Sequence, residues 1–347
     1  MRPLFVSGCE RSGTTAFADY LNEHPRILVL RERYRFHPEE ITPDLFDFDR
    51  IMDFTEADRD DRRKIDGWYK NLTARMLAAK DPSELAWIGD KDPFYLEDLE
   101  DLQRNNPGAR FIILYRPVEE VAESWQARSA DPEDVWPGEK DFEIGVRTWN
   151  RSLNLIRSFI QSGSEPEVLL LDYHDFFYRN EPCAGLISRF LELDFDTAVR
   201  EAWEDLSLKF EAERRPKTSL SEEQLGFIKR NKDSAAEAWI TSRISEQWGE
   251  FGIHPGRYAD PAVRDERQRA ADLLAARGAA HVQALKVRKL ERQLEQQEKI
   301  IAAQRERNGR LGRRIERLTT RIRDMENSKV WRMAGLAKSI RRKVLGK

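Results

Sequence analysis

The strongest constraint on the fold is a glycine-bounded turn that links an apolar run to a helix-like segment, at residues 4–15 (L-F-V-S-G-C-E-R-S-G-T-T). Gly8 and Gly13 are separated by four residues, and Thr14 and Thr15 follow. Such a turn presents backbone N–H groups at a helix N-terminus, where phosphate-like anions bind. The pattern predicts an anion-binding loop, with a strand–turn–helix junction that binds nothing as the alternative.

The loop departs from the nucleotide phosphate loop G-x-x-x-x-G-K-[ST] at one position. Thr14 stands where the lysine should be. That lysine pairs with transferring phosphates and its neighbour holds Mg²⁺, so its loss makes magnesium-dependent nucleotide hydrolysis a weaker hypothesis. We expect Arg11 and the hydroxyl groups of the loop to hold the anion instead, without a metal.

The chain up to residue 260 alternates between apolar runs and helix-spaced segments. Strands are predicted at 27–30, 84–89, 109–115 and 168–171, and helices at 63–80, 95–104, 140–162 and 183–191. Residues 37–62 read as a loop, and 196–253 as mostly helical. This order predicts an α/β domain over 1–260: a P-loop-like, doubly wound parallel sheet flanked by helices. Charged residues after the strand at 27–30 would then lie at the crevice of the sheet.

Charge is divided unevenly along the chain. Residues 262–347 hold 24 Lys and Arg against 10 Asp and Glu, while the first 261 residues hold 35 and 52. An acidic body argues against nucleic-acid binding, and a basic end favours an anionic surface. Only Cys9 and Cys183 are present, which favours a reducing compartment. With no room for a leader before the first strand and no long apolar run, we expect a cytoplasmic, peripheral protein.

A heptad repeat predicts a coiled coil over 262–328, with self-association through 273–326. The a and d positions alternate along the list Val287, Leu290, Leu294, Gln297, Ile301, Gln304, Asn308, Leu311, Ile315, Leu318, Ile322 and Met325. Asn308 at an a position favours a parallel two-stranded register. A single charged helix packed on the body is the alternative.

The tail at 329–347 carries seven Lys and Arg and no acid. Apolar residues recur there at spacings of three and four, and Trp331 stands near the start. This composition is typical of a helix that lies in the interface of an anionic membrane. A frayed, solubilising tail is the alternative.

Three separated elements resemble sulfotransferases that use 3′-phosphoadenosine 5′-phosphosulfate (PAPS). The R-S-G-T-T loop is similar to their 5′-phosphosulfate loop, and strand 111–115 with Arg116, Ser124 and Arg128 is similar to their 3′-phosphate element. The stretch from Tyr173 to residue 193 is similar to their Y-E-x-L and F-L-G-L segments, with His174 in the place of the usual acid. The resemblance implies that PAPS is bound by these residues: Gly8, Cys9, Glu10, Arg11, Ser12, Gly13, Thr14, Thr15, Arg116, Ser124, Arg128 and Tyr173.

Within that family the residues look most like the tyrosylprotein branch. There a glutamate 21 residues after the loop arginine acts as base, which implies Glu32, and a lysine in a K-D-P-F context implies Lys91. The resemblance therefore makes Glu32, Arg11 and Lys91 the catalytic set. Alternatives remain open: an ordinary ion pair for Glu32, a surface charge cluster for Lys91, and a role confined to its own helix for Arg128.

The acceptor is less constrained by the sequence. The tail S-K-V-W-R-M-A-G-L looks like endings of bacterial surface-polysaccharide enzymes, which favours a glycan acceptor. Trp125, Trp136 and Trp149 are candidates for stacking on sugars or for core positions. The rival hypotheses are a tyrosylprotein sulfotransferase, a nucleotide kinase with a degenerate loop, and an inactive domain that heads a coiled-coil scaffold.

Overall fold

The computed structural model describes residues 1–35, 37–54, 67–134, 136–163, 166–178, 180–212 and 220–251, six residues between 269 and 278, and residues 312, 315–325 and 329–345. The chain forms two compact units, Met1–His281 and Val282–Lys347. The predicted boundary after residue 260 and most of the predicted heptads lie outside the described residues.

The first unit is built on a parallel sheet, as the sequence predicted. In the described part of the chain it has five strands in the order β2-β3-β1-β4-β5. Their bounds are β1 Arg2–Gly8, β2 Ile27–Arg31, β3 Trp87–Lys91, β4 Arg110–Tyr115 and β5 Glu167–Asp172. Nearly every strand residue is buried, because helices cover both faces of the sheet.

The helices of this unit begin where local signals place them. Asp141 caps α7 by accepting hydrogen bonds from the N–H groups of Glu143 and Ile144, and Ser221 forms a capping box at the start of α11. The described helices of the unit are α1 Thr14–Glu23, α2 Phe48–Met52, α4 Trp68–Ala78, α5 Leu99–Asn105, α6 Val118–Ser129, α7 Phe142–Gln161, α8 Tyr173–Tyr178, α9 Asn180–Leu191, α10 Thr197–Ala212, α11 Glu222–Asn231 and α12 Ser234–Glu250, with 3₁₀ turns η1 Pro38–Glu40, η2 Pro43–Phe46 and η4 Pro93–Glu97.

Two predictions of local structure were wrong. The described part of the expected loop at 37–62 contains η1, η2 and α2, because Asp47 caps α2 and Phe46 and Ile51 are buried. The helix expected at 95–104 is broken into η4 and α5, since Pro93 starts a 3₁₀ turn that ends at Glu97 and Asp98 separates it from α5.

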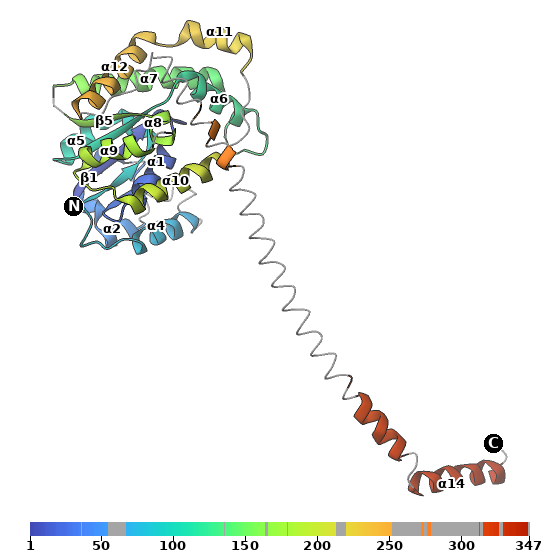
Figure 1. Ribbon diagram of the computed structural model, residues 1–347. Coiled ribbons are helices and arrows are strands. Elements are labelled where there is room, and N and C mark those ends of the chain that lie inside the picture. Colours follow the sequence, from blue (N-terminus) through green and yellow to red (C-terminus); the bar gives the residue numbers. More distant parts are fainter. Residues whose placement is uncertain are drawn as a thin grey trace. The chain divides into compact units, whose positions relative to one another are not determined.

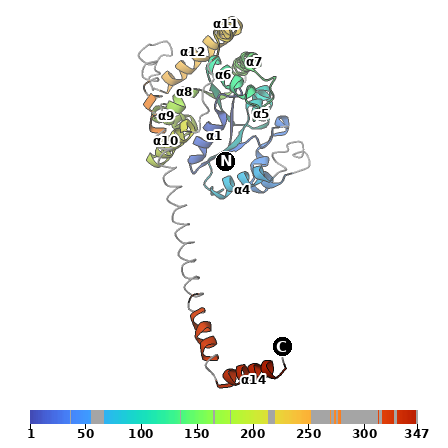
Figure 2. The same cartoon turned by 90° about the vertical axis from the view of Figure 1, so that its right-hand side faces the viewer.

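Aromatic clusters fill the space on both sides of the sheet. On one side, Phe5 of β1 stacks on Phe111 of β4, and Phe159 of α7 packs edge-on against Phe111. On the other side, Tyr20 of α1 packs against Trp203 of α10, and these two helices lie side by side in both views (Figures 1 and 2). The sheet is therefore held rigid, and its carboxyl edge is a fixed platform.

The second unit contributes described helical residues at 315–325 and helix α14, Lys329–Leu345. Four of the heptad positions are described, and all are helical, with side chains between 50% and 63% exposed: Ile315, Leu318, Ile322 and Met325. Within the described residues, no helix has both the length and the apolar content needed to cross a membrane.

Candidate active site

Five predicted site residues stand at the carboxyl ends of the five strands. Arg11 follows β1, Glu32 follows β2, Lys91 is the last residue of β3, Arg116 follows β4 and Tyr173 follows β5. Because parallel strands all end on one edge of the sheet, residues far apart in the sequence meet there.

The loop after β1 makes a left-handed turn twice. Arg11 has φ 73° and Gly13 has φ 88°, and the N–H of Ser12 donates to the carbonyl of Cys9 at 3.0 Å. Helix α1 begins at Thr14, so the N–H groups of its first turn point out of the helix end with no acceptor inside the helix. The loop thus has the geometry of a backbone anion site.

Gly13 is required by both conformation and space. A Cβ atom there would lie 2.8 Å from Cδ2 and 2.9 Å from Cε2 of Tyr173. The Tyr173 ring also carries the Arg116 guanidinium, 4.1 Å from the ring centroid. The structure therefore packs together three residues that are predicted to bind PAPS: Gly13, Arg116 and Tyr173.

Ser12 shows that the loop is built to receive a polar group. Its side chain is fully buried, and among the residues that the structure describes its Oγ has no hydrogen-bond partner. A buried hydroxyl left without a partner costs free energy, roughly 1–3 kcal/mol. A phosphate or sulfate oxygen on the loop would supply the missing partner, so the residues present fit a phosphosulfate.

Three arginines converge beside the loop. Arg11 Nε donates to Ser124 Oγ at 3.1 Å, and Arg116 Nη1 donates to the Arg11 carbonyl at 2.9 Å. Burial, followed by the charges of Arg128 and Arg116, lowers the pKa of Arg11 to about 10. Like charges held this close together favour a bound anion.

Arg116 has a carboxylate partner that the sequence reasoning missed. Glu120 accepts from Arg116 Nε at 3.0 Å and from Nη2 at 2.9 Å, and His174 Nε2 lies 2.6 Å from its other oxygen. Burial acts to raise the pKa of Glu120, but the hydrogen bond and charge of His174 and the charge of Arg116 bring it down to about 2. Arg116 lies just before α6 and Glu120 in its first turn, and their i, i+4 spacing was the signal available in the sequence.

The Arg128 guanidinium is already engaged by other side chains of the protein. It makes a bidentate pair with Asp134, at 2.9 Å and 2.6 Å, and stacks on Trp136 at 4.6 Å. Its charge still acts on Arg11. The donor-binding role of Arg128 stays a prediction.

Lys91 links the loop to the predicted base. Its side chain is only 1% exposed, and Nζ donates to Thr15 Oγ1 at 2.9 Å and to Glu32 Oε1 at 2.8 Å. A surface charge cluster is therefore wrong as a description of Lys91. Arg35 Nη2 lies 2.9 Å from the other oxygen of Glu32.

Two more loop residues have surroundings that restrict their chemistry. Cys9 is buried, and burial raises the pKa of its thiol to about 12, so it is no nucleophile. Burial also raises the pKa of Glu10, against the lowering effects of Lys140 and Arg35. Both residues shape the loop through their backbone.

The tryptophans separate into core and edge. Trp125 is 1% exposed and Trp149 is fully buried, with its indole N–H donating to the Arg116 carbonyl at 2.8 Å. These two belong to the core rather than to a sugar-stacking surface. Trp136 is partly buried against them.

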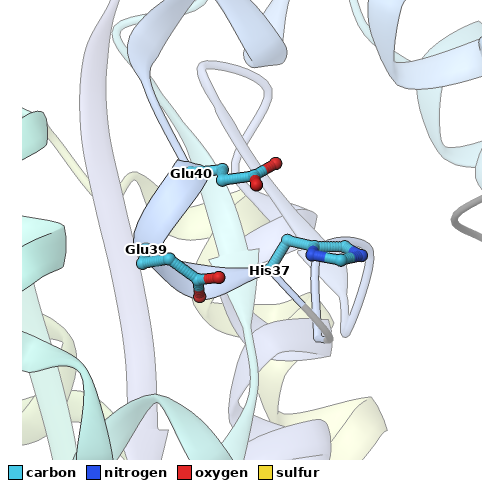
Figure 3. A group of neighbouring side chains, drawn as sticks. All are labelled: His37, Glu39 and Glu40. Atoms are coloured by element: carbon cyan, nitrogen blue, oxygen red, sulfur yellow. The ribbon is translucent and has the colours of Figure 1, made fainter.

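A separate group of side chains has the spacing of metal ligands. Ligand atoms of His37, Glu39 and Glu40 all lie within 4.8 Å of one another, and all three side chains are exposed (Figure 3). In the described part of the chain this is the one such group. None of the three belongs to the predicted site, and exposed acidic groups of this kind are common without an ion.

Comparison with known proteins gives the family of this fold. The sulfotransferase family model matches residues 3–197. This chain belongs to the sulfotransferase family. The matched segment includes the loop, Glu32, Lys91, Arg116 and Tyr173, and it supports a sulfotransferase enzyme.

Several solved sulfotransferase structures are similar to this chain at low sequence identity. A sulfotransferase from Mycobacterium tuberculosis is 17% identical, with a TM-score of 0.42, and the match covers 67% of this chain and 76% of that one. One from Alicyclobacillus acidocaldarius is 16% identical, with a TM-score of 0.41, covering 74% and 98%. A mouse sulfotransferase complexed with PAP (adenosine 3′,5′-bisphosphate) is 11% identical, with a TM-score of 0.35, and the match covers 78% of this chain and 88% of that one. No curated protein sequence matches this chain significantly.

Proposed function

We propose that this sulfotransferase moves the sulfuryl group of PAPS to a hydroxyl of a bacterial cell-surface glycan, with Glu32 as the base. The observation that carries the proposal is the double contact of Lys91, whose Nζ binds Thr15 of the loop and Glu32 at once. The Lys91 side chain therefore contacts both the predicted base and the loop that is predicted to bind the donor.

The donor would lie across the carboxyl edge of the sheet. Its 5′-phosphosulfate fits the loop from Gly8 to Thr15, where the Ser12 hydroxyl lacks a partner. Its 3′-phosphate fits beside Arg116 and Ser124, where guanidinium groups already gather. An arginine fork matches the oxygens of a phosphate, and no metal is needed for this neutralisation.

The transfer needs a base, cations that neutralise the charge on the leaving phosphate, and fixed geometry. Glu32 takes the proton of the acceptor hydroxyl, whose oxygen forms the new bond to sulfur while the bond from sulfur to the 5′-phosphate oxygen breaks. Lys91 and Arg11 neutralise the charge that grows on the departing phosphate. Positioning and charge neutralisation supply most of the catalysis, as in phosphoryl transfer.

The C-terminal unit favours an acceptor at a membrane. Helix α14 exposes Met333, Leu336 and Ile340, at 57–68%, beside a set of lysines and arginines. Apolar and basic residues together favour the interface of an anionic bilayer. Exposed heptad positions Ile315 and Leu318 favour self-association through 273–326. We therefore place the enzyme on the cytoplasmic face of the cell membrane.

The test is transfer from radiolabelled PAPS to a membrane glycan fraction. Glu32→Gln should lower turnover by about a hundred- to ten-thousandfold while PAP binding is kept, since general-base catalysis is worth about that much. Glu84→Gln, at an exposed position before β3 and so at the opposite edge of the sheet, is the matched control and should stay active. A fully active Glu32→Gln enzyme would remove Glu32 as the base.

A second acceptor is favoured by one feature of the site. The glutamate and lysine of the site match the tyrosylprotein branch, which would make the acceptor a tyrosine of a protein. Offering a tyrosine peptide beside the glycan fraction decides between them, because the label can appear on only one product class. Pelleting with anionic liposomes, with and without residues 329–347, tests the membrane part separately.

A further inference from the structure

The end of β3 holds the segment that follows β2 at successive points. The carbonyl of Lys91 accepts the N–H of Glu32 at 2.8 Å. The carboxylate of Asp90, fully buried, accepts the N–H of Tyr34 at 3.1 Å. The backbone of this segment is thus fastened to the end of β3 at Glu32 itself and two residues beyond it.

A third contact is made by side chains. Arg35 Nε donates to Asp92 Oδ2 at 2.8 Å, and Nη2 donates to Oδ1 at 3.2 Å. Asp92 is fully buried, and its Oδ1 also accepts the N–H of Phe94 at 3.0 Å. Asp92 therefore cannot rotate, and the fork of Arg35 is fixed in direction.

The same guanidinium reaches the predicted base. Arg35 Nη2 lies 2.9 Å from Glu32 Oε2, while Lys91 holds Oε1. Glu32 is also one of few non-glycine residues with left-handed backbone in the described chain, at φ 60°. A residue keeps such a conformation only where its surroundings hold it, and such residues gather at functional sites.

We propose that Arg35, aligned by Asp92, is the positioning residue that aims the Glu32 carboxylate at the acceptor hydroxyl and keeps it charged. This rests on the proposed role of Glu32 as base. Lys91 fixes one oxygen of Glu32, and Arg35 fixes the other, so the two cations together set the direction of the carboxylate. A base displaced by about 1 Å can lose about a hundredfold in rate.

The charge of Arg35 also bears on the pH dependence of turnover. In the described part of the chain, the groups that act on Glu32 include Lys91 and Asp92 from the end of β3, Arg35 from its own segment and Tyr69 from α4. A neighbouring cation favours the charged form of a carboxyl group. Loss of Arg35 therefore makes Glu32 easier to protonate, and the acidic limb of kcat moves to higher pH.

Three variants separate the two effects of Arg35 on Glu32, which are the direction given by its guanidinium fork and its positive charge. Arg35→Met removes both, Arg35→Lys keeps the charge without the fork, and Asp92→Asn frees the fork. The matched control is Arg50→Met, which breaks an exposed pair with Asp44 at 3.7 Å on a nearby helix. Each variant is assayed for PAP affinity by calorimetry and for kcat and its pH profile, with radiolabelled PAPS and a membrane glycan fraction.

We expect Arg35→Met to lower kcat about ten- to a hundredfold, to leave PAP affinity within about twofold, and to move the acidic limb up by about one pH unit. Arg35→Lys should keep the limb in place and recover part of kcat, and Asp92→Asn should lower kcat in the same direction. The control should match the wild type.

Wild-type kcat and an unmoved acidic limb in Arg35→Met would overturn the inference. So would loss of PAP binding in all three variants, because that result would make the pair a support of the whole crevice. An inactive Glu32→Gln beside a fully active Arg35→Met refutes only this positioning role, whereas an active Glu32→Gln refutes the base itself.

Discussion

Replacing Gly13 by alanine tests whether the loop, Tyr173 and Arg116 act as one group. A left-handed residue costs an alanine about 1–2 kcal/mol, and the new Cβ would lie 2.8 Å from the Tyr173 ring. That ring is stacked on Phe177, with centroids 5.4 Å apart, and cannot move aside freely. Overpacking adds about 1–3 kcal/mol, so we expect a loss of roughly 2–5 kcal/mol in the free energy of unfolding.

The assay pairs urea unfolding with calorimetric titration of PAP. Gly108→Ala is the control, since Gly108 also has left-handed backbone, at φ 76°, but no atom within 4 Å of the added Cβ. It should lose only about 1–2 kcal/mol and bind PAP normally. Gly13→Ala should in addition weaken PAP binding about tenfold, because the displaced ring carries Arg116. Equal losses in the two variants, with unchanged PAP affinity, would refute the reasoning.

Three further predictions concern titratable groups. Folding lowers the pKa of Glu120 from 4.5 to about 2, so its contribution of roughly 3 kcal/mol is present above pH 4.5 and is lost as the pH falls toward 2; Glu120→Gln should show a smaller acid-induced loss of stability in urea unfolding. Folding raises the pKa of Asp90 from 3.8 to about 6, mainly through burial, so stability falls as pH rises through that window, and Asp90→Asn should flatten the decline. Cys9 and Cys183 are buried, and iodoacetamide at mildly alkaline pH should label them only after unfolding; rapid labelling of the native protein would contradict their burial.

The architecture followed from patterns that act locally. Apolar runs such as 109–115 mark strands buried on both faces, and their alternation with helical segments fixes the order of elements. The short helices between 38 and 52 did not follow, because they depend on Phe46 and Ile51 finding a buried place against the sheet. Tertiary packing outweighed the local loop signal of proline and acidic residues there.

The site was predictable where a motif carried it, and less so where it depends on partners. Arg11, Lys91 and Glu32 could be named from spacing and resemblance. The roles of Arg35 and Asp92 could not, because an ion pair across two strand ends is set by register rather than by sequence distance. Glu120 lies four residues after Arg116, and that short-range signal was present in the sequence but was not used. Trp125 and Trp149 show the converse: their residue type suggested binding, and burial makes them core.

We propose, as the basis of the function, that the cations at the carboxyl edge of the sheet bind PAPS, and PAP after transfer, without a metal. The most direct measurement is a calorimetric titration of the full chain with PAP, in buffer containing a chelator, beside adenosine 5′-monophosphate. We expect one PAP per chain, bound roughly ten- to a hundredfold more tightly than the monophosphate, since a charged hydrogen bond to the 3′-phosphate is worth about 1.5–3 kcal/mol. No binding of PAP, equal affinity for both, or binding that requires Mg²⁺ would contradict it.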